Sequence, residues 1–303
     1  MGSSIGGLLA DSGVEVYLID PWREHVDAMN RDGLRLSVDA SQRNVEVEAR
    51  TGCEGIGTVD LVIVLVKSFN TRTAVMSARS LIGDNTIVLS LQNGLGNEEI
   101  IEEVVGRHHV VGGRTFAGGA VLGPGSVKTN VLGKTTFIGE LDGSDTARVK
   151  EIARAFTAAG LETMISHNVI GIMWDKLLVN VATAALSGIT RLPYGGLYSV
   201  PELKEVALEA IGEGMAVAAA AGVILDTKSP LDAWVKASEG LPPDFKPSLS
   251  QGLERGQMSE IDFLNGAVVS YGARFGIPTP VNRTLVAAIR GIEYRIEHYP
   301  DGS

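Results

Sequence analysis

The sequence predicts an α/β protein, in which a Rossmann-like domain with a doubly wound parallel sheet is followed by an all-α domain. Short apolar strands alternate with helical segments in the first half of the chain, and strand signals stop after His167. Such alternation is typical of βαβ units, which build a parallel sheet with helices on both faces. The 303 residues, 45% of them hydrophobic, are enough for two domains. We expect these domains at 1–166 and 167–303.

Three apolar runs in the first half have the length and composition of buried strands. They are rich in Val, Ile and Leu, and turn residues follow or precede them. Helical segments at 21–30 and 73–82 lie between them. The runs are VEVYLID at 14–20, DLVIVLVK at 60–67 and NTIVLSLQ at 85–92.

The segment 109–140 is strand-like and interrupted by glycines, which predicts β-hairpins that close the sheet. A helix at 144–159 and a short strand at 162–166 follow. Beyond them we expect only helices, and a cleft between the two domains in which a substrate meets its cofactor. Helical periodicity covers residues 201–222, 258–275 and 279–297.

The chain opens with a predicted helix, GSSIGGLLADSG, where a Rossmann domain should open with a strand. In the dinucleotide fingerprint G-x-G-x-x-G the third glycine lies just inside this helix and lets it pack closely on a strand, a role that Gly2 fits. Asp20 ends the next strand, where the fold places the acid that binds the ribose. A glycine that simply eases packing is the alternative. The opening strand and the first two glycines of the fingerprint are missing from this pattern.

Composition restricts the class of function. A net charge of -10 gives no basic patch for nucleic acid or an anionic membrane. The single cysteine, Cys53, excludes an intramolecular disulfide and favours a reducing compartment. No apolar run reaches about 20 residues and no signal peptide is evident, so we expect a cytoplasmic protein. The five histidines are adjacent or isolated, which predicts no metal site.

In the second half, Lys176 and Asn180 are four residues apart and share one face of a predicted helix. Trp174 and Leu178 would pack into the core. These positions leave Lys176 either at a solvated edge or directed into the cleft.

Five separated motifs resemble, in order, those of the ketopantoate reductase (2-dehydropantoate 2-reductase) family. Met1-Gly2-Ser3 also matches the end of the family's glycine-rich turn, which implies that the chain starts at an internal methionine. The resemblance covers nearly the whole chain, and several ordered motifs are far more specific than one glycine pattern. The motifs are V-K-x-x-x-T at 66–71, N-G-L-G at 93–96, W-x-K-x-x-x-N at 174–180, P-S-x-x-Q at 247–251 and E-I-D-x-x-N-G at 260–266.

The resemblance implies an NAD(P)H-dependent reductase of 2-keto acids, which converts 2-dehydropantoate to pantoate on the way to pantothenate and coenzyme A. Lys176 would be the general acid, held in place and kept charged by Glu260. The substrate-binding residues implied are Asn180, Ser248, Asn93 and Tyr194. The cofactor-binding residues implied are Gly2, Ser3, Asp20, Lys67 and Asn93.

The sequence departs from the family where substrate is recognised. Ala184 and Tyr194 replace two asparagines, and Gly252 replaces an acid. A dehydrogenase of other branched or bulky 2-keto acids therefore remains an alternative, as does a cofactor-binding protein without turnover. NADP follows from the resemblance, whereas Asp20 favours NAD; Arg23 could still reach a 2′-phosphate. A homodimer remains open.

Overall fold

The computed structural model describes residues 1–299 and divides the chain into two compact units. Met1–Gln92 and Asn97–Val169 form the first, whereas Asn93–Gly96 and the chain from Ile170 onward form the second. The predicted domain boundary after Ser166 stays a prediction. No pattern in the sequence indicates that the turn at 93–96 packs with the helices of the second unit.

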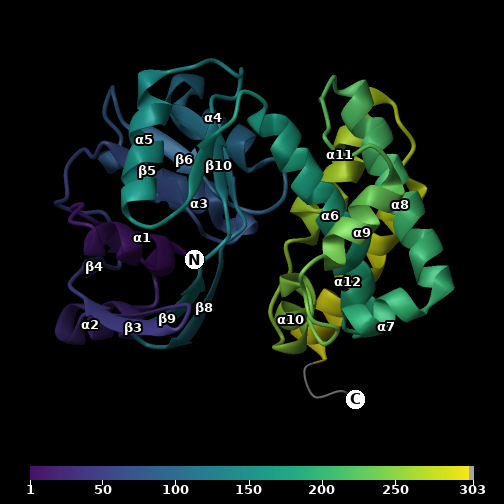
Figure 1. Ribbon diagram of the computed structural model, residues 1–303, viewed down its shortest axis with the longest axis horizontal. Helices are drawn as coiled ribbons and strands as arrows, with labels where there is room; N and C mark the ends of the chain where they lie inside the picture. Colours follow the sequence, from purple (N-terminus) through teal and green to yellow (C-terminus); the bar gives the residue numbers. More distant parts are fainter. Residues whose placement is uncertain (300–303) are drawn as a thin grey trace. The chain divides into compact units, whose positions relative to one another are not determined.

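A five-stranded sheet forms the centre of the first unit, in the order β11-β10-β7-β6-β5 (Figure 1). β5, β6 and β7 are parallel, while β10 runs antiparallel to β7 and parallel to β11. The strands are β5 (Leu61–Val64), β6 (Ile87–Ser90), β7 (Val110–Thr115), β10 (Thr136–Gly139) and β11 (Thr163–Ile165). The strands predicted at 60–67, 85–92 and 162–166 are thus confirmed.

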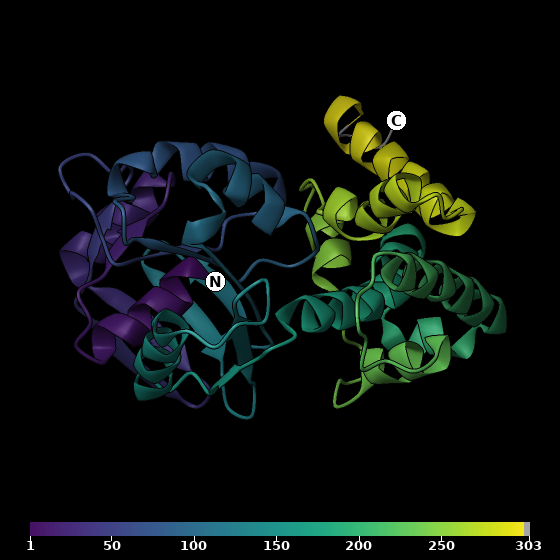
Figure 2. The ribbon, with the colours of Figure 1, turned by 90° about the horizontal axis from the view of Figure 1, so that it is seen from above.

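Helices cover both faces of this sheet, which confirms the doubly wound fold (Figure 2). Successive residues of a strand point to opposite faces. Val88 of β6 accordingly shares one apolar core with Ile101, and Leu89 shares another with Phe156. The helices of this unit are α1 (Gly2–Asp11), α2 (Arg23–Asp32), α3 (Thr71–Ser77), α4 (Asn97–Val105) and α5 (Ala147–Ala158).

The remaining strands form two smaller sheets. β1 (Tyr17–Ile19) pairs in parallel with β4 (Glu48–Arg50). A four-stranded sheet has the order β3-β2-β9-β8. Its strands are β2 (Leu34–Val38), β3 (Ser41–Val45), β8 (Gly118–Gly123) and β9 (Ser126–Asn130).

The prediction that the hairpins of 109–140 close the central sheet is therefore wrong in part. β8 and β9 do form an antiparallel hairpin, but β9 pairs in parallel with β2 in the separate sheet. The hairpin of β2 and β3 supplies that partner. Its second strand begins with four exposed residues, Ser41 to Asn44, so the apolar pattern that marks a buried strand is missing.

Close packing of α1 depends on Gly6 and Gly7. A Cβ on Gly6 would overlap Leu18 of β1, and one on Gly7 would lie 2.6 Å from Leu34 Cδ2 of β2. The packing role predicted for Gly2 is wrong, because no described atom outside its own neighbourhood lies within 4 Å of a Cβ built there. Gly2 faces open space at the start of the helix, and the glycines one turn later make the contact.

The second unit contains helices and no strand within the part of the chain that the structure describes, which confirms the all-α prediction. α11 lies beside both α8 and α12 (Figure 2). A single 3₁₀ turn, η4 (Ile261–Phe263), precedes α11. The α-helices are α6 (Val169–Thr190), α7 (Tyr194–Ser199), α8 (Pro201–Ala220), α9 (Pro230–Ser238), α10 (Ser248–Glu254), α11 (Asn265–Phe275) and α12 (Pro280–His298).

α6 is the buried helix of this unit. Its 22 residues are long and apolar enough to cross a membrane, which corrects our expectation that no segment would be. Asp175 and Lys176 interrupt the apolar run, but the mean hydropathy of the helix stays high, at 1.5 in its most apolar window. Because 72% of its most apolar window is buried inside the fold, α6 has the character of a core helix. Leu177 and Leu178 are 1% and 0% exposed.

Arg114 of β7 and Glu98 of α4 form an ion pair inside the first unit. Arg114 Nη1 donates to Glu98 Oε1 at 2.9 Å and to the Gly113 carbonyl at 2.6 Å. The two side chains are 1% and 4% exposed. Among the described residues, Glu98 Oε2 has no hydrogen-bond partner. Desolvation offsets most of the attraction in such a pair, but either charge alone would be strongly unfavourable.

We expect Glu98→Ala to lower the free energy of unfolding by about 3–5 kcal/mol, because the buried guanidinium loses its counter-charge. The double replacement Glu98→Leu with Arg114→Met should recover most of that loss. Urea unfolding measures both. The control is Glu103→Ala in the exposed pair with Arg72, which should cost under about 1 kcal/mol. If Glu98→Ala lowered the free energy of unfolding as little as Glu103→Ala does, the prediction would be wrong.

Candidate functional site

The start of α1 has the properties of an anion-binding site. The first N–H groups of a helix have no partner within it, and its dipole favours negative charge there. Ser4 Oγ is buried and has no hydrogen-bond partner among residues 1–299. The space around Gly2 is open. These donors and this space fit the pyrophosphate of a dinucleotide.

Two charged side chains lie near this helix start. Burial lowers the pKa of the Met1 amine; the charge of Asp20 opposes that shift and the charge of Lys67 adds to it. Asp20 directly follows β1, and its Oδ1 accepts the Trp22 N–H at 2.9 Å. Lys67 is exposed just beyond β5. The structure thus brings together Gly2, Ser3, Asp20 and Lys67, which the sequence assigned to cofactor binding.

A buried polar network that sequence reasoning missed holds the ends of β5 and β6. Gln92 Nε2 donates to the Val66 carbonyl at 2.9 Å and to Thr71 Oγ1 at 2.8 Å. Thr71 Oγ1 in turn donates to Asn97 Oδ1 at 2.9 Å. All three polar side chains are at most 3% exposed. Because Lys67 follows Val66 directly, this network fixes the backbone that presents Lys67. The only signal in the sequence is a polar residue directly after an apolar strand.

His25 ties α2 to the start of α1. Its Nδ1 accepts the Gly125 N–H at 2.9 Å, and its Nε2 lies 3.1 Å from Ser3 Oγ. The ring stacks on Trp22, with 5.2 Å between centroids. His25 is 1% exposed, and burial lowers its pKa below the usual value. Burial therefore favours the neutral imidazole next to the start of α1.

We expect the stabilisation by His25 to weaken in mild acid. Because its folded pKa lies below the unfolded value of about 6.5, the unfolded chain binds the proton more readily. The contribution is complete above about pH 6.5 and falls by at most about 1.4 kcal/mol per pH unit as pH drops toward the folded pKa. Urea unfolding of wild type and His25→Gln from pH 8 to 5 measures it.

The difference in stability between wild type and His25→Gln should shrink as pH falls below 6.5. The control is His108→Gln, which removes an exposed imidazole instead of a buried one. A His25→Gln difference that is constant across this range would show that the imidazole is not held neutral.

Two anchors fix the first half of α6. Trp174 packs edge-on against Tyr271 of α11, with ring centroids 5.5 Å apart. The buried carboxylate of Asp175 accepts the backbone N–H groups of Asp226 and Thr227 at 3.0 and 2.9 Å. An aromatic contact on one side and two charge-assisted hydrogen bonds on the other set the rotation of the helix.

This rotation places Lys176 and Asn180 on one face of α6, where both are half-buried. Thr183 continues the face, and its Oγ1 lies 3.1 Å from the hydroxyl of Tyr194. Tyr194 is 6% exposed and packs edge-on against Phe245. Burial raises its pKa, so the hydroxyl stays protonated. Tyr194 thus lies in the core one turn beyond Asn180, and its contact with substrate stays a prediction.

The turn of Asn93 packs against the turn of Glu260. Leu95 N–H donates to the Phe263 carbonyl at 2.9 Å, and Phe263 N–H donates to the Glu260 carbonyl at 3.0 Å. Gly94 has a φ of 81°, and a Cβ there would overlap that same Phe263 carbonyl. Two predicted site residues 167 positions apart in the sequence therefore belong to adjoining turns.

Ser248 and Ala184 differ in exposure. Ser248 is exposed as the first residue of α10, and its contact with substrate stays a prediction. Ala184, which replaces a family asparagine, is 2% exposed. Among the described residues, no group of three or more His, Cys, Asp or Glu side chains could hold a metal ion.

Comparison with known proteins gives a consistent result over both units. Residues 1–143 match the family described as ketopantoate reductase PanE/ApbA, and residues 168–293 match its C-terminal counterpart. The chain is 35% identical to a 2-dehydropantoate 2-reductase of Pyrococcus horikoshii over 293 residues, which is 97% of this chain and 94% of the relative.

Two solved structures show the same fold. A PanE/ApbA family ketopantoate reductase from Ralstonia eutropha is 35% identical, with a TM-score of 0.89 over 98% of this chain and 96% of that one. A D-mandelate dehydrogenase in complex with NADH and anilino(oxo)acetate is 27% identical, with a TM-score of 0.89 and the same two coverages.

Proposed function

This chain belongs to the ketopantoate reductase PanE/ApbA family, and we propose that it reduces 2-dehydropantoate to pantoate with a nicotinamide dinucleotide. The observation that carries the proposal is the anchored face of α6. It presents Lys176 and Asn180 together, in a chain similar to 2-dehydropantoate 2-reductases over nearly its full length. The family is one of enzymes, so turnover is favoured over cofactor binding alone.

The first unit supplies the groups that would hold the dinucleotide. The donors at the start of α1, with Ser3 and the open space at Gly2, suit the pyrophosphate, and Lys67 adds positive charge. NADPH is the family's cofactor. NADH is the close rival, because the Asp20 carboxylate can accept from a free 2′-hydroxyl and would repel a 2′-phosphate. Arg23, exposed at the start of α2, offers the compensating charge for NADPH.

The reaction needs a hydride, a proton and a site for developing negative charge. A nicotinamide held by the first unit would supply the hydride, and as the hydride adds to the keto carbon the carbonyl π pair moves onto oxygen. Lys176 Nζ donates the proton to that oxygen and gives the 2-hydroxy acid. A positioned general acid contributes about 10² to 10⁴ in rate. The half-buried position of Lys176 strengthens its interaction with the forming alkoxide, because screening by water is reduced.

The remaining site residues position the lysine and the substrate. Glu260 would hold the Lys176 ammonium and keep it charged. Asn180 and Ser248 would donate neutral hydrogen bonds to the substrate's hydroxyl or carboxylate. Asn93, held in the turn that adjoins Glu260, would reach the ribose or the substrate.

We expect Lys176→Ala to lower kcat by about 10² or more, because no other assigned group can protonate the alkoxide. The affinity for the dinucleotide should stay unchanged, since its assigned contacts lie on α1 and on the segments that follow β1, β5 and β6, and none lies on α6. Steady-state kinetics and dinucleotide titration separate the two effects. Glu260→Ala should lose less activity through the same step.

The matched control is Lys204→Ala, an exposed lysine on α8 that removes the same charge without touching the site. It should retain the wild-type kcat. If Lys176→Ala keeps more than about a tenth of the activity, Lys176 is not the general acid.

A second candidate function is the reduction of other branched or bulky 2-keto acids. Ala184 and Tyr194 remove two amides that the family places near the substrate, and the Tyr194 hydroxyl is already engaged by Thr183. The similar D-mandelate dehydrogenase was solved with anilino(oxo)acetate, a bulky 2-keto acid analogue. A site without these amides is poorly equipped to recognise the terminal hydroxyl of 2-dehydropantoate.

We therefore expect 2-dehydropantoate to be preferred by less than about tenfold in kcat/KM over 2-keto-3-methyl acids of similar bulk, which is under about 1.4 kcal/mol. A site that pairs the hydroxyl can discriminate by about 10⁴ or more. A panel of such acids, assayed with NADPH and NADH, measures the ratio. A thousandfold preference would mean that another group, such as Asn180 or Ser248, pairs the hydroxyl.

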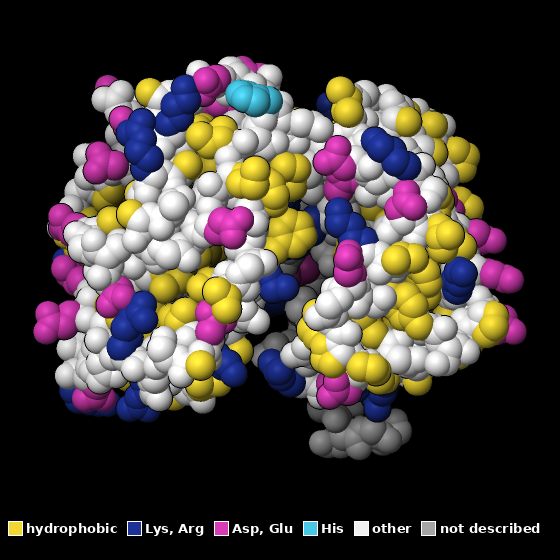
Figure 3. Space-filling model, viewed as in Figure 1, with side chains coloured by type: hydrophobic (Ala, Val, Ile, Leu, Met, Phe, Trp, Pro, Cys, Tyr) yellow, Lys and Arg dark blue, Asp and Glu magenta, His cyan; other side chains and the backbone are white. Residues whose placement is uncertain are grey.

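We further propose that the protein acts in the cytoplasm. Its single cysteine, Cys53, is 6% exposed, and burial raises the pKa of the thiol. Little thiolate forms, so the side chain is unreactive. Positive and negative side chains are interspersed over the face in Figure 3, without a continuous field of one sign.

An assembly of two copies stays a prediction that analytical ultracentrifugation would test.

A further inference from the structure

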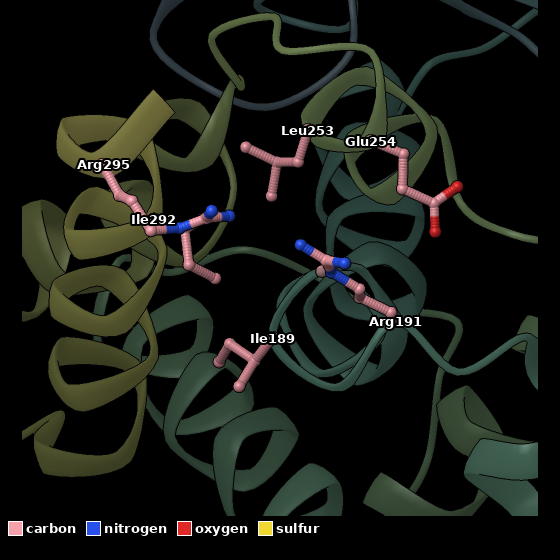
Figure 4. A pocket seen from close by; sticks show the side chains of 7 residues that line it. Ile189, Arg191, Leu253, Glu254, Ile292 and Arg295 are labelled. Atoms are coloured by element: carbon pink, nitrogen blue, oxygen red, sulfur yellow. The ribbon is translucent and has the colours of Figure 1, made fainter. Parts of the chain in front are cut away.

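A cavity of about 240 Å³ lies entirely within the second unit, where the C-terminal end of α6 meets α10 and α12 (Figure 4). Gly188 makes this meeting close, because a Cβ there would lie 2.8 Å from Leu249 Cδ2 of α10 and 3.0 Å from Ile289 Cδ1 of α12. The cavity begins twelve residues beyond Lys176 on the same helix, about 18 Å at 1.5 Å per residue. It is therefore separate from Lys176.

Two arginines face each other across this cavity. The guanidinium groups of Arg191 and Arg295 point toward one another in Figure 4, while the Glu254 carboxylate points away. Glu254 is instead ion-paired with Lys246. Within residues 1–299, neither guanidinium forms an ion pair with a carboxylate. Two like charges that converge repel, and because the described residues provide no carboxylate partner for either, an anion between them would be stabilised by both.

The backbone of Arg191 supports a role for its side chain. Its φ of 61° lies in the left-handed region, which disfavours side chains and in which glycine is usual just after a helix. Arg191 N–H bonds to the Ser187 carbonyl and so closes the end of α6. A glycine would satisfy this backbone with less strain, yet the position carries a cation directed into the cavity.

The rest of the lining is mainly apolar. Ile189, Leu253 and Ile292 line the cavity with the two arginines, and Ile189 is 37% exposed. The volume of about 240 Å³ suits a compact molecule. Apolar surface beside paired guanidiniums is complementary to a ligand with one anionic end and a short hydrocarbon body.

We propose that this cavity is a second binding site, for a small branched carboxylic acid. The carboxylate lies between the guanidiniums of Arg191 and Arg295, and the branched body covers Leu253, Ile189 and Ile292. Arginine suits this task because its planar fork matches the two carboxylate oxygens. The site is independent of the dinucleotide and of the reaction proposed above.

The test is a calorimetric titration of the full chain with 3-methylbutanoate, in the absence of dinucleotide. Arg191→Gly and Arg295→Gln should each weaken binding by at least about tenfold, as loss of one charge-assisted contact implies. Arg191→Gly should keep or raise the melting temperature, since glycine suits that backbone, so lost binding cannot be attributed to misfolding. Arg283→Gln, an exposed arginine on α12, should leave binding unchanged.

Two further probes define the ligand class. The neutral 3-methylbutan-1-ol and inorganic phosphate should both bind at least about tenfold more weakly than 3-methylbutanoate, because each lacks one half of the recognised chemistry. Equal binding of 3-methylbutanoate to wild type and both cavity variants would overturn the proposal, as would phosphate binding as tight as that of the carboxylate. Neither result depends on turnover, so the proposed reductase activity is judged separately.

Discussion

The anchoring of Asp175 decides what the second unit can do. Consecutive residues of a helix differ by about 100° in direction, so a small rotation of α6 would turn Lys176 from the assigned face toward the core. The two backbone hydrogen bonds that Asp175 accepts, with the Trp174 contact to Tyr271, prevent that rotation. A buried carboxylate to which no chemical role is assigned thus sets the direction of Lys176, the lysine proposed as the general acid.

In the first unit, strand ends position the side chains assigned to cofactor binding. Residues that follow different strands lie close together there, whatever their distance in sequence. Lys67 follows β5 of the central sheet and Asp20 follows β1 of the two-stranded sheet, and both lie near the start of α1. The backbone after β5 would be loose without further support. Gln92, Thr71 and Asn97 supply it through a buried network, which is stiff because each member is satisfied by the next.

Much of the fold could be predicted because its central strands are short apolar runs between turn residues, a pattern with few alternative structures. The hairpin of β2 and β3 escaped prediction, since Ser41–Asn44 is polar and is defined by its pairing with β2. Gly6 and Gly7 were missed because a close contact depends on the partner strand, which sequence does not position. The motifs identified Lys176 and Asn180, whereas the anchors of α6 depend on residues about 50 and 100 positions away.

The short turn at Asn93–Gly96 makes the second unit discontinuous in the sequence. Leu95 supplies a backbone hydrogen bond to Phe263, and Gly94 allows the close approach. A fragment starting at Ile170 would lack both and leave the Phe263 carbonyl without that donor. Chimeras that exchange halves between relatives at a single crossover would therefore mismatch this contact, so successful recombination requires two exchanged stretches.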